Sequence, residues 1–411
     1  MPSTVSLARC ATYERADLRR AVHETLNALP ELPELLARGK RVLLKPNLLS
    51  SNDPPEAAIN THPEFLRAVA EFFLERGCKV FMGDSCGSLS AGSTNRAIVL
   101  TGVDRVAAEV GAQVVDFDRA PTMDLDIPSG RRLRRIRVPK LLHEVDLFVT
   151  LPKLKTHGLT LLTGAVKNQL GLIPGKGKKN VHLAAPRPDS IAEAMVDIYS
   201  VVRPHLAIMD GVVGMEGNGP AAGRPRPVGL VLASADCVAL DAVMGEIMGY
   251  EPGEVATTRM ARERGLGAGR LEDIRVAGVP LDDARIPGYL HPPLRVSGAF
   301  FKMLPAFVIR WMYNNVGGTY ATVMDDRCVL CGECVANCPA QAMVIEGKRL
   351  RISRAQCISC YCCSEVCQRQ AIKMRRPLGG SIIYGLVHLV SGRSRKAERL
   401  HSREEKTSNA P

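Results

Sequence analysis

Residues 63–82, PEFLRAVAEFFLERGCKVFM, carry a helix pattern followed by a strand pattern. Five apolar side chains recur at the three- and four-residue spacing that gathers them on one helical face: Phe65, Leu66, Val69, Phe72 and Phe73. Gly77 then supplies the glycine at which helices commonly end, and residues 79–82 form a short β-rich apolar run. A similar run at residues 42–44 precedes the helix. The stretch therefore predicts a strand–helix–strand unit.

The same alternation extends outward from this unit, from about residue 41 to residue 279. Further strands are predicted at residues 112–115, 146–150, 206–209 and 229–232. Further helices are predicted at residues 190–202 and 237–248. Strands that alternate with helices indicate an α/β domain with a largely parallel sheet, in which functional loops lie at the carboxyl ends of the strands.

Composition divides the chain into four parts. Residues 1–286 form the predicted α/β domain, and residues 287–320 form an apolar connector punctuated by prolines. Residues 321–376 are rich in cysteine, in two evenly spaced runs, and predict a second, small α+β domain. Residues 377–411 are a C-terminal extension with a basic tail that we expect to be disordered, because the tail is charged and poor in apolar residues.

Overall composition excludes several classes of protein. Hydrophobic residues make up 46% of the 411 residues and charged residues 23%, which excludes global disorder. Aromatic residues, at 4%, are too few for a surface that stacks single-stranded nucleic acid. The formal net charge of +12 does not count the negative charge of iron-sulfur clusters. We therefore expect no nucleic-acid partner, and we expect the arginine-rich run at residues 131–137 to be an exposed strand or a dock for an acidic redox protein.

Targeting signals are not visible in the sequence. Residues 1–20 lack the apolar core of an export signal. The most apolar stretches, residues 299–312 and 380–390, are interrupted or short, so we expect no transmembrane segment and a cytoplasmic protein with reduced thiols. Two interpretations stay open for one group of apolar residues, which could pack between the domains or make peripheral contact with a membrane: Phe300, Phe301, Phe307, Ile309 and Trp311.

Two cysteine runs share one spacing, in which three cysteines two residues apart are followed by a fourth after three residues. The first run is Cys328, Cys331, Cys334 and Cys338, and the second is Cys357, Cys360, Cys363 and Cys367. Three closely spaced thiolates suit one iron-sulfur cube, while the displaced fourth cysteine reaches the other cube. Zinc modules instead use separated pairs of cysteines.

The cysteine runs resemble the bacterial-type dicluster ferredoxins over about residues 325–374. That resemblance implies two [4Fe-4S] clusters, one held by Cys328, Cys331, Cys334 and Cys367, the other by Cys357, Cys360, Cys363 and Cys338. Gln368 stands where these ferredoxins usually carry proline. Cys362 is an additional cysteine, either a packed free thiol or a substitute ligand.

Polar residues follow several of the predicted strands. Lys45 and Asp84 follow the first two, and Asp210 follows residues 206–209. The strand at residues 146–150 is followed by the polar sequences PKLKTH (152–157) and TGAVKN (163–168), with His182 close behind. Because these groups are interleaved with glycine, we expect a pocket for an anion or a polarised carbonyl. The candidate catalytic residues are Lys155, His157, Lys167, Asp84 and Asp210, with Glu216 as a further acid for proton transfer or metal ligation.

Each of these polar residues also has a purely structural interpretation: the acids as loop caps, the lysines as solvated chains and His157 as a core hydrogen-bonding residue. The runs KPN, PKLKTH, TGAVKN, IPG, DG and MEGNGP together resemble the DUF362 family over roughly residues 42–245. Members of that family are often fused to a dicluster ferredoxin. The resemblance implies the fold and an association with iron-sulfur clusters, and it implies no reaction.

The leading prediction is an electron-transferring iron-sulfur oxidoreductase. Its clusters would exchange electrons with an unknown small-molecule substrate at the α/β loops and with a redox partner protein or reductase. The alternative is a non-catalytic electron carrier or assembly partner whose α/β domain binds a ligand or a protein. Turnover with a reductant and a substrate separates the two.

Overall fold

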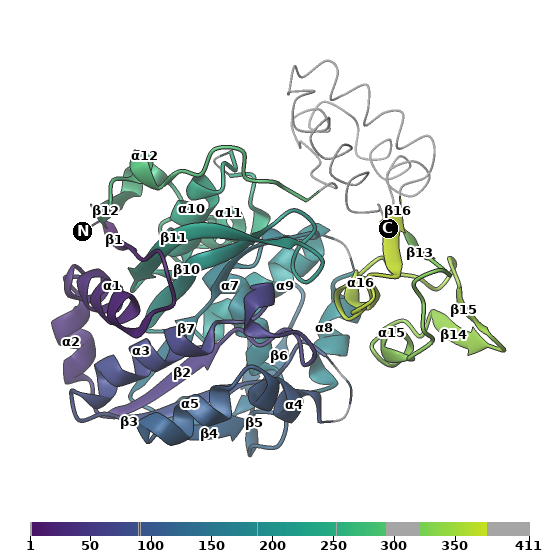
Figure 1. Ribbon diagram of the computed structural model, residues 1–411, viewed down its shortest axis with the longest axis horizontal. Helices are drawn as coiled ribbons and strands as arrows, with labels where there is room; N and C mark the ends of the chain where they lie inside the picture. Colours follow the sequence, from purple (N-terminus) through teal and green to yellow (C-terminus); the bar gives the residue numbers. More distant parts are fainter. Residues whose placement is uncertain are drawn as a thin grey trace.

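A computed structural model of the chain describes residues 2–292, apart from residues 89, 91, 187 and 252, and residues 320–375 (Figure 1). Phe300, Phe301, Phe307, Ile309 and Trp311 of the connector, like the C-terminal tail, lie outside these described residues. No helix among the described residues is long and apolar enough to cross a membrane.

The first part of the chain is built on a ten-stranded sheet in the order β12-β1-β11-β10-β7-β2-β3-β4, with β8 and β9 joined to it through β10. The strands are β1 (Ser3–Arg9), β2 (Arg41–Pro46), β3 (Lys79–Asp84), β4 (Gln113–Asp116), β7 (Leu147–Leu151), β8 (Lys153–His157), β9 (Leu161–Leu162), β10 (Leu206–Glu216), β11 (Arg224–Ser234) and β12 (Ile274–Gly278). A separate antiparallel pair joins β5 (Thr122–Asp126) and β6 (Arg135–Pro139).

Most of the pairings in the sheet are parallel, as the alternating pattern predicts. Strands β10, β7, β2, β3 and β4 form a continuous parallel run. Two features were not predicted from the sequence. The N-terminal strand β1 pairs antiparallel with β11, and β11 pairs antiparallel with β10 along most of its length. Residues 153–157 form the buried strand β8 instead of a loop.

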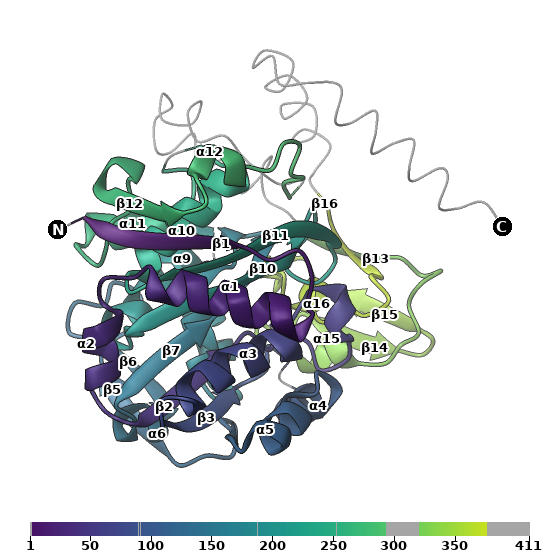
Figure 2. The ribbon, with the colours of Figure 1, turned by 60° about the vertical axis from the view of Figure 1, so that its left-hand side comes forward.

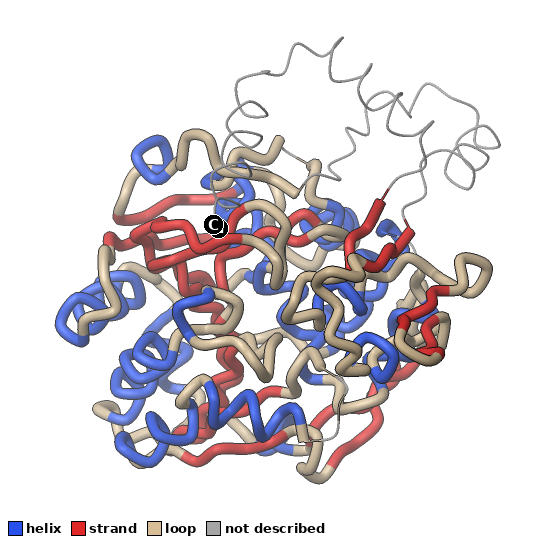
Figure 3. The backbone as a smooth tube through the Cα atoms, turned by 45° about the vertical axis from the view of Figure 1, so that its right-hand side comes forward, coloured by secondary structure: helices blue, strands red, loops and turns tan. Residues whose placement is uncertain are grey.

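Helices cover both faces of the sheet (Figures 2 and 3). One apolar core lies beneath α1 (Arg15–Asn27), α3 (Pro63–Leu74), α4 (Ser93–Leu100) and α5 (Val103–Val110). Two further cores on the other face include residues of α7 (Gly164–Asn168), α9 (Pro188–Val201) and α10 (Cys237–Ile247). The remaining helices are α2 (Leu32–Ala37), α6 (Leu141–Glu144), α8 (Gly177–Ala184), α11 (Ala256–Glu263) and α12 (Leu281–Ala284), with short 3-10 turns at Pro55–Ala57, Gln169–Leu172 and Leu271–Asp273.

Helix α3 shows how the sequence pattern becomes packing. The apolar face predicted from residues 63–76 is buried, and Phe65, Phe72 and Phe73 have no exposed surface. Each such ring contributes about 1.5–3 kcal/mol of burial free energy. The helix ends at Leu74, and Gly77 adopts the left-handed conformation, with φ of 73°, that lets the chain turn into β3.

The cysteine-rich part forms a small separate module beside the α/β domain (Figure 1). It contains two antiparallel pairs, β13 (Tyr320–Val323) with β16 (Ile372–Arg375) and β14 (Met343–Glu346) with β15 (Arg349–Ile352). Its helices are the single turns α15 (Glu333–Ala336) and α16 (Cys362–Glu365). The predicted combination of a largely parallel α/β domain and a small α+β module is confirmed.

The basic run at residues 131–137 lies largely at the edge of this architecture. Within it, Arg135 and Arg137 lie on β6 and pair with Asp126 and Asp124 of β5 at 2.6 and 2.7 Å. Arg132 pairs with Glu193 at 2.6 Å. Because acids balance these arginines, the run is a charge-paired surface.

Candidate cluster loops and interdomain pocket

The small module holds nine cysteines, eight of them in the two runs and Cys362 beside the second run. Burial first, and then the charges of Cys367, Cys331 and Cys328, raise the pKa of Cys334 to about 11. Burial, followed by Cys360, Cys357 and Cys338, raises the pKa of Cys363 well above its usual value. Cys334 also contributes to the shift at Cys363, so each of these two thiols has cysteines of both runs among its neighbours.

Both cysteine runs impose the same unusual backbone. Leu330 and Ser359, which occupy equivalent positions, have φ of 54°. The equivalent residues Gln341 and Gln370 have φ of 52° and 49°. Residues other than glycine rarely adopt such angles and persist there only where the surroundings enforce them. The two loops are therefore built alike and fit the shape of a thiolate-ligated cluster.

The fourth cysteine of each run accepts a backbone hydrogen bond. Ala342 N–H donates to Cys338 Sγ, and Ala371 N–H donates to Cys367 Sγ, both at 3.2 Å. Hydrogen bonds to cluster sulfurs help set reduction potentials. This donor set, with eight thiols in two runs and matched amides, fits two iron-sulfur clusters.

A pocket of about 1260 Å³, including its opening to solvent, lies between the module and the α/β domain. From the α/β side it is lined by residues at the ends of β2 and β3, by the loop after β2 and by α7. From the module it is lined by Asn337, Cys362, Glu365 and Cys367. The carboxyl edge of the parallel sheet and the cluster loops thus share one cavity.

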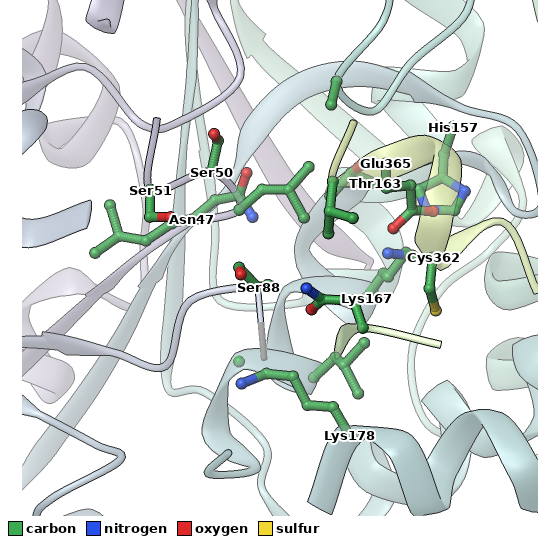
Figure 4. A pocket seen from close by; sticks show the side chains of 18 of the residues that line it. Asn47, Ser50, Ser51, Ser88, His157, Thr163, Lys167, Lys178, Cys362 and Glu365 are labelled. Atoms are coloured by element: carbon green, nitrogen blue, oxygen red, sulfur yellow. The ribbon is translucent and has the colours of Figure 1, made fainter. Parts of the chain in front are cut away.

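The labelled side chains of the pocket form two walls (Figure 4). Asn47, Ser50, Ser51 and Ser88 lie on one side. The other side holds the residues of β8, α7 and α16: His157, Thr163, Lys167, Cys362 and Glu365. The two domains also touch where Ser90 donates a hydrogen bond to Glu333 at 2.5 Å.

Lys45 and Asp84 form a buried ion pair at the base of the pocket. Their charged atoms are 2.8 Å apart, and Leu48 N–H also donates to Asp84 at 2.8 Å. Burial lowers the pKa of Lys45 and raises that of Asp84, and the partner opposes each shift. Gly171 passes so close that a Cβ there would lie 2.1 Å from Asp84 Oδ1. This position therefore requires glycine.

Asp210 lies in a second buried network and is not among the described residues that line the pocket. Lys153 Nζ is 2.8 Å from Asp210 Oδ2 and donates to Tyr13 OH at 2.7 Å. Tyr13 OH donates to Asp210 Oδ1 at 2.9 Å, and the His62 N–H donates to Oδ2 at 3.0 Å. The network joins the N-terminal segment to β8 and β10.

Lys155 is also buried away from the described pocket lining. Its Nζ donates to the Ile59 carbonyl at 2.6 Å. Burial, with Lys167 as the next cause, lowers the pKa of Lys155 well below its usual range. Glu216 pairs with Arg224 at 3.2 Å. The structure thus brings Asp84, His157 and Lys167 to the pocket, and it gives Asp210, Lys155 and Glu216 partners elsewhere.

His157 is held in one orientation and one protonation form. The Leu159 and Thr160 N–H groups donate to its Nδ1 at 3.0 and 3.3 Å. Burial, and then Lys167, lowers its pKa well below the usual value. The neutral ring therefore carries its proton on Nε2, which lies 3.4 Å from Glu365 Oε1. His157 is a hydrogen-bond donor toward the pocket and the module.

Two more basic side chains complete the polar lining. Lys178 Nζ donates to Ser85 Oγ, and burial lowers the pKa of Lys178. Burial and the charge of Lys167 lower the pKa of His182 to about 4. His182 is therefore neutral near pH 7.

Sequence reasoning missed the contributions of Glu365 and Lys178 to the pocket, and it considered Cys362 only as a thiol of the cluster module. One available signal was the carboxylate of Glu365 between two cysteines of a cluster motif. Another was the lysine-rich GKGKK sequence at residues 175–179. Neither signal says that the two segments meet across a cavity.

Comparisons with known proteins agree with this architecture. A family model described as a domain of unknown function (DUF362) matches residues 42–246, and a 4Fe-4S dicluster domain model matches residues 321–368. The thylakoid-associated protein sll1697 of Synechocystis sp. is 37% identical over 268 residues, covering 65% of this chain and 80% of that protein.

Two weaker similarities are also present. Indolepyruvate oxidoreductase subunit IorA of Archaeoglobus fulgidus is 27% identical over 165 residues, which cover 37% of this chain and 26% of that protein. The lactate racemase apoprotein from Thermoanaerobacterium thermosaccharolyticum aligns with a TM-score of 0.40 and 14% identity, covering 60% of this chain and 57% of that one.

The module and the α/β domain therefore match separate family models and have separate cores. The dicluster match agrees with the duplicated cysteine loops, which makes the chain an iron-sulfur protein of the electron-carrying type. The DUF362 match spans the strands that border the pocket. The chain belongs to the DUF362 family and carries a 4Fe-4S dicluster domain after its α/β domain.

Proposed function

We propose that this protein is an electron-transferring oxidoreductase that oxidises or reduces a small molecule held in the interdomain pocket. The observation that carries the proposal is the pocket lining, in which Cys367 and Glu365 of the cluster module face the carboxyl ends of the α/β strands. The cavity places a bound ligand beside a cluster loop, and turnover of that ligand separates this proposal from a non-catalytic carrier that only binds it.

The proposal assigns the eight run cysteines to two [4Fe-4S] clusters, with Cys328, Cys331, Cys334 and Cys367 around one, and Cys357, Cys360, Cys363 and Cys338 around the other. When bound, such clusters supply electrons one at a time. A redox partner protein or reductase would exchange electrons with these clusters. Cys331 is exposed, so one cluster site comes close to solvent at this surface. We also retain the division into residues 1–286, 287–320, 321–376 and 377–411.

The side chains of the chain have separable roles in this proposal. Lys167 and the neutral His157 contact and orient the substrate, since both line the cavity and His157 presents Nε2–H toward it. Asp84 holds Lys45 at the base of the pocket. Lys155 and Asp210 are positioning residues, because each is occupied by a partner behind the lining and together they fix strands β8 and β10.

Reoxidation of the reduced clusters tests the proposal. The anaerobically purified full chain would be reduced with dithionite, freed of reductant and mixed with deproteinised extract of its native cells, while the visible absorbance of the clusters is followed. We expect extract-dependent reoxidation that slows at least tenfold in Lys167→Gln and is unchanged in Lys176→Gln, a control on an exposed lysine outside the lining. Equal rates in all three proteins, with electron exchange only to other redox proteins, would support the carrier alternative and overturn the proposal.

A further inference from the structure

Lys167 differs from the other lysines of the pocket in having no bound partner. Lys45 is paired with Asp84, and Lys178 donates to Ser85. Among the described residues, Lys167 Nζ makes no hydrogen bond or ion pair. Burial lowers the pKa of Lys167, and the charges of Glu365 and Cys362 oppose that shift. The pocket therefore presents one ammonium group that a ligand can use.

Polar atoms beside Lys167 also lack partners. Thr163 and Asn168 are each 97% buried, yet Thr163 Oγ1 and Asn168 Oδ1 have no hydrogen-bond partner among the described residues. The same holds for His182 Nδ1. A buried polar atom without a partner costs about 1–3 kcal/mol, so a group of them beside a cavity indicates that a ligand supplies the missing bonds.

The residues that carry these atoms all line the same pocket. Thr163 and Lys167 are four residues apart at the start and end of the α7 turn, a spacing that places both on one face. After burial, the charge of Lys167 is the next cause that lowers the pKa values of His157 and His182. Both neutral rings therefore lie near Lys167. Figure 4 shows Lys167 on the same side of the cavity as Thr163, His157 and Cys362.

The charges of the site define the class of ligand. The ammonium group of Lys167 with the hydroxyl donor of Thr163 beside it matches one carboxylate. Glu365 is the acid that the module contributes to the lining. Its Oε1 faces His157 Nε2, and it makes no ion pair to Lys167 among the described contacts. Asn168 Oδ1 is an acceptor and would receive a hydroxyl or amine donor of the same ligand.

We propose that the pocket binds a small organic acid through a single carboxylate, with Lys167 Nζ and Thr163 Oγ1 as donors to its oxygens. This inference names the substrate class of the same pocket, so its role in catalysis rests on the proposed function. Binding itself requires no electron transfer and can be measured separately.

The probes are butyrate and its uncharged amide, butyramide, with inorganic phosphate as a third ligand. Each would be titrated into the anaerobically purified holoprotein and its binding followed by saturation-transfer NMR of the ligand protons, or by phosphorus NMR for phosphate. We expect butyrate to bind saturably and at least tenfold more tightly than butyramide, because only the carboxylate pairs with the ammonium group.

Two variants and two controls locate the binding. Lys167→Gln should weaken butyrate binding about ten- to hundredfold, and Thr163→Val about three- to tenfold. The Thr163 side chain makes no capping hydrogen bond to α7, so its valine variant should fold normally. Lys176→Gln removes the same charge from an exposed site and should bind butyrate like the parent, and cluster absorbance should be unchanged in every variant.

Three results would overturn the inference: no saturable butyrate binding, equal binding of butyrate and butyramide, or phosphate binding tighter than butyrate binding. Equal butyrate affinity in the parent and Lys167→Gln would also overturn it. Carboxylate binding at Lys167 without any extract-dependent reoxidation would keep the anion site and refute the electron-transfer function. Extract-dependent reoxidation without a preference for carboxylates would support the electron-transfer function and refute the carboxylate site.

Discussion

Asp84 compensates the charge of the Lys45 side chain, which is fully buried. Asp84→Ala would leave an ammonium group that is 0% exposed without its carboxylate, and breaking a buried pair in this way costs about 3–5 kcal/mol. We expect a loss of that size in the free energy of unfolding, measured by anaerobic denaturant titration. Asp126→Ala, which breaks an exposed pair with Arg135, should cost under about 1 kcal/mol. Similar losses in both variants would contradict the assignment.

Asp241 couples the position of α7 to pH. Its oxygens accept the Ala165 and Val166 N–H groups at 2.5 and 3.0 Å, yet burial raises its pKa to about 7. Because the folded pKa lies above the unfolded value, the contribution of Asp241 to stability is full below about pH 4 and is lost as the pH rises through 7. The lost contribution is about 4 kcal/mol at most, from 1.36 kcal/mol per pKa unit.

Denaturant unfolding of the parent and of Asp241→Asn between pH 4 and pH 8 measures this effect. The free-energy difference between the two proteins should favour the parent most at the acidic end and shrink toward pH 8, since asparagine does not titrate. A difference that stays constant over this range would show that Asp241 is ionised throughout.

Helix α16 carries two adjacent cysteines with different surroundings. Cys363 is buried among Cys360, Cys357 and Cys338, whereas the Cys362 side chain borders the pocket. We expect Cys363→Ser to lose or degrade one cluster and Cys362→Ser to keep both, as measured by iron content and visible absorbance of anaerobically purified protein. Equal loss of iron in the two variants would refute this assignment of ligands.

At the scale of the whole molecule, the duplicated cysteine loops predict the metal content. Two four-iron clusters require about eight irons and eight sulfides per chain. Anaerobically purified protein should show this stoichiometry, a broad brown absorption and a paramagnetic signal after reduction. Zinc in stoichiometric amount, without these optical and magnetic features, would contradict the prediction.

The sequence predicted local structure well wherever one pattern dominated. The apolar face of residues 63–76 predicted α3, because helical spacing and burial agree there. The pattern failed at residues 153–157, where Lys153, Lys155 and His157 predict a solvated loop. Pairing with β10 and β9 makes this segment a strand, and the buried polar groups are compensated by Asp210, by the Ile59 carbonyl and by backbone amides. Those partners come from distant segments that no local window contains.

The sequence by itself determined the α/β class, the cysteine spacing and the polar character of the strand ends, because each depends on residues close together in the chain. Which polar residues share a cavity depends on the tertiary structure. Lys45 and Asp84 are brought together by neighbouring parallel strands, and Glu365 reaches His157 because the module docks on the sheet edge. Burial also sets the protonation of His157. Removal of water lowers the pKa of the ring, and the nearby charge of Lys167 lowers it further. Both effects depend on three-dimensional packing.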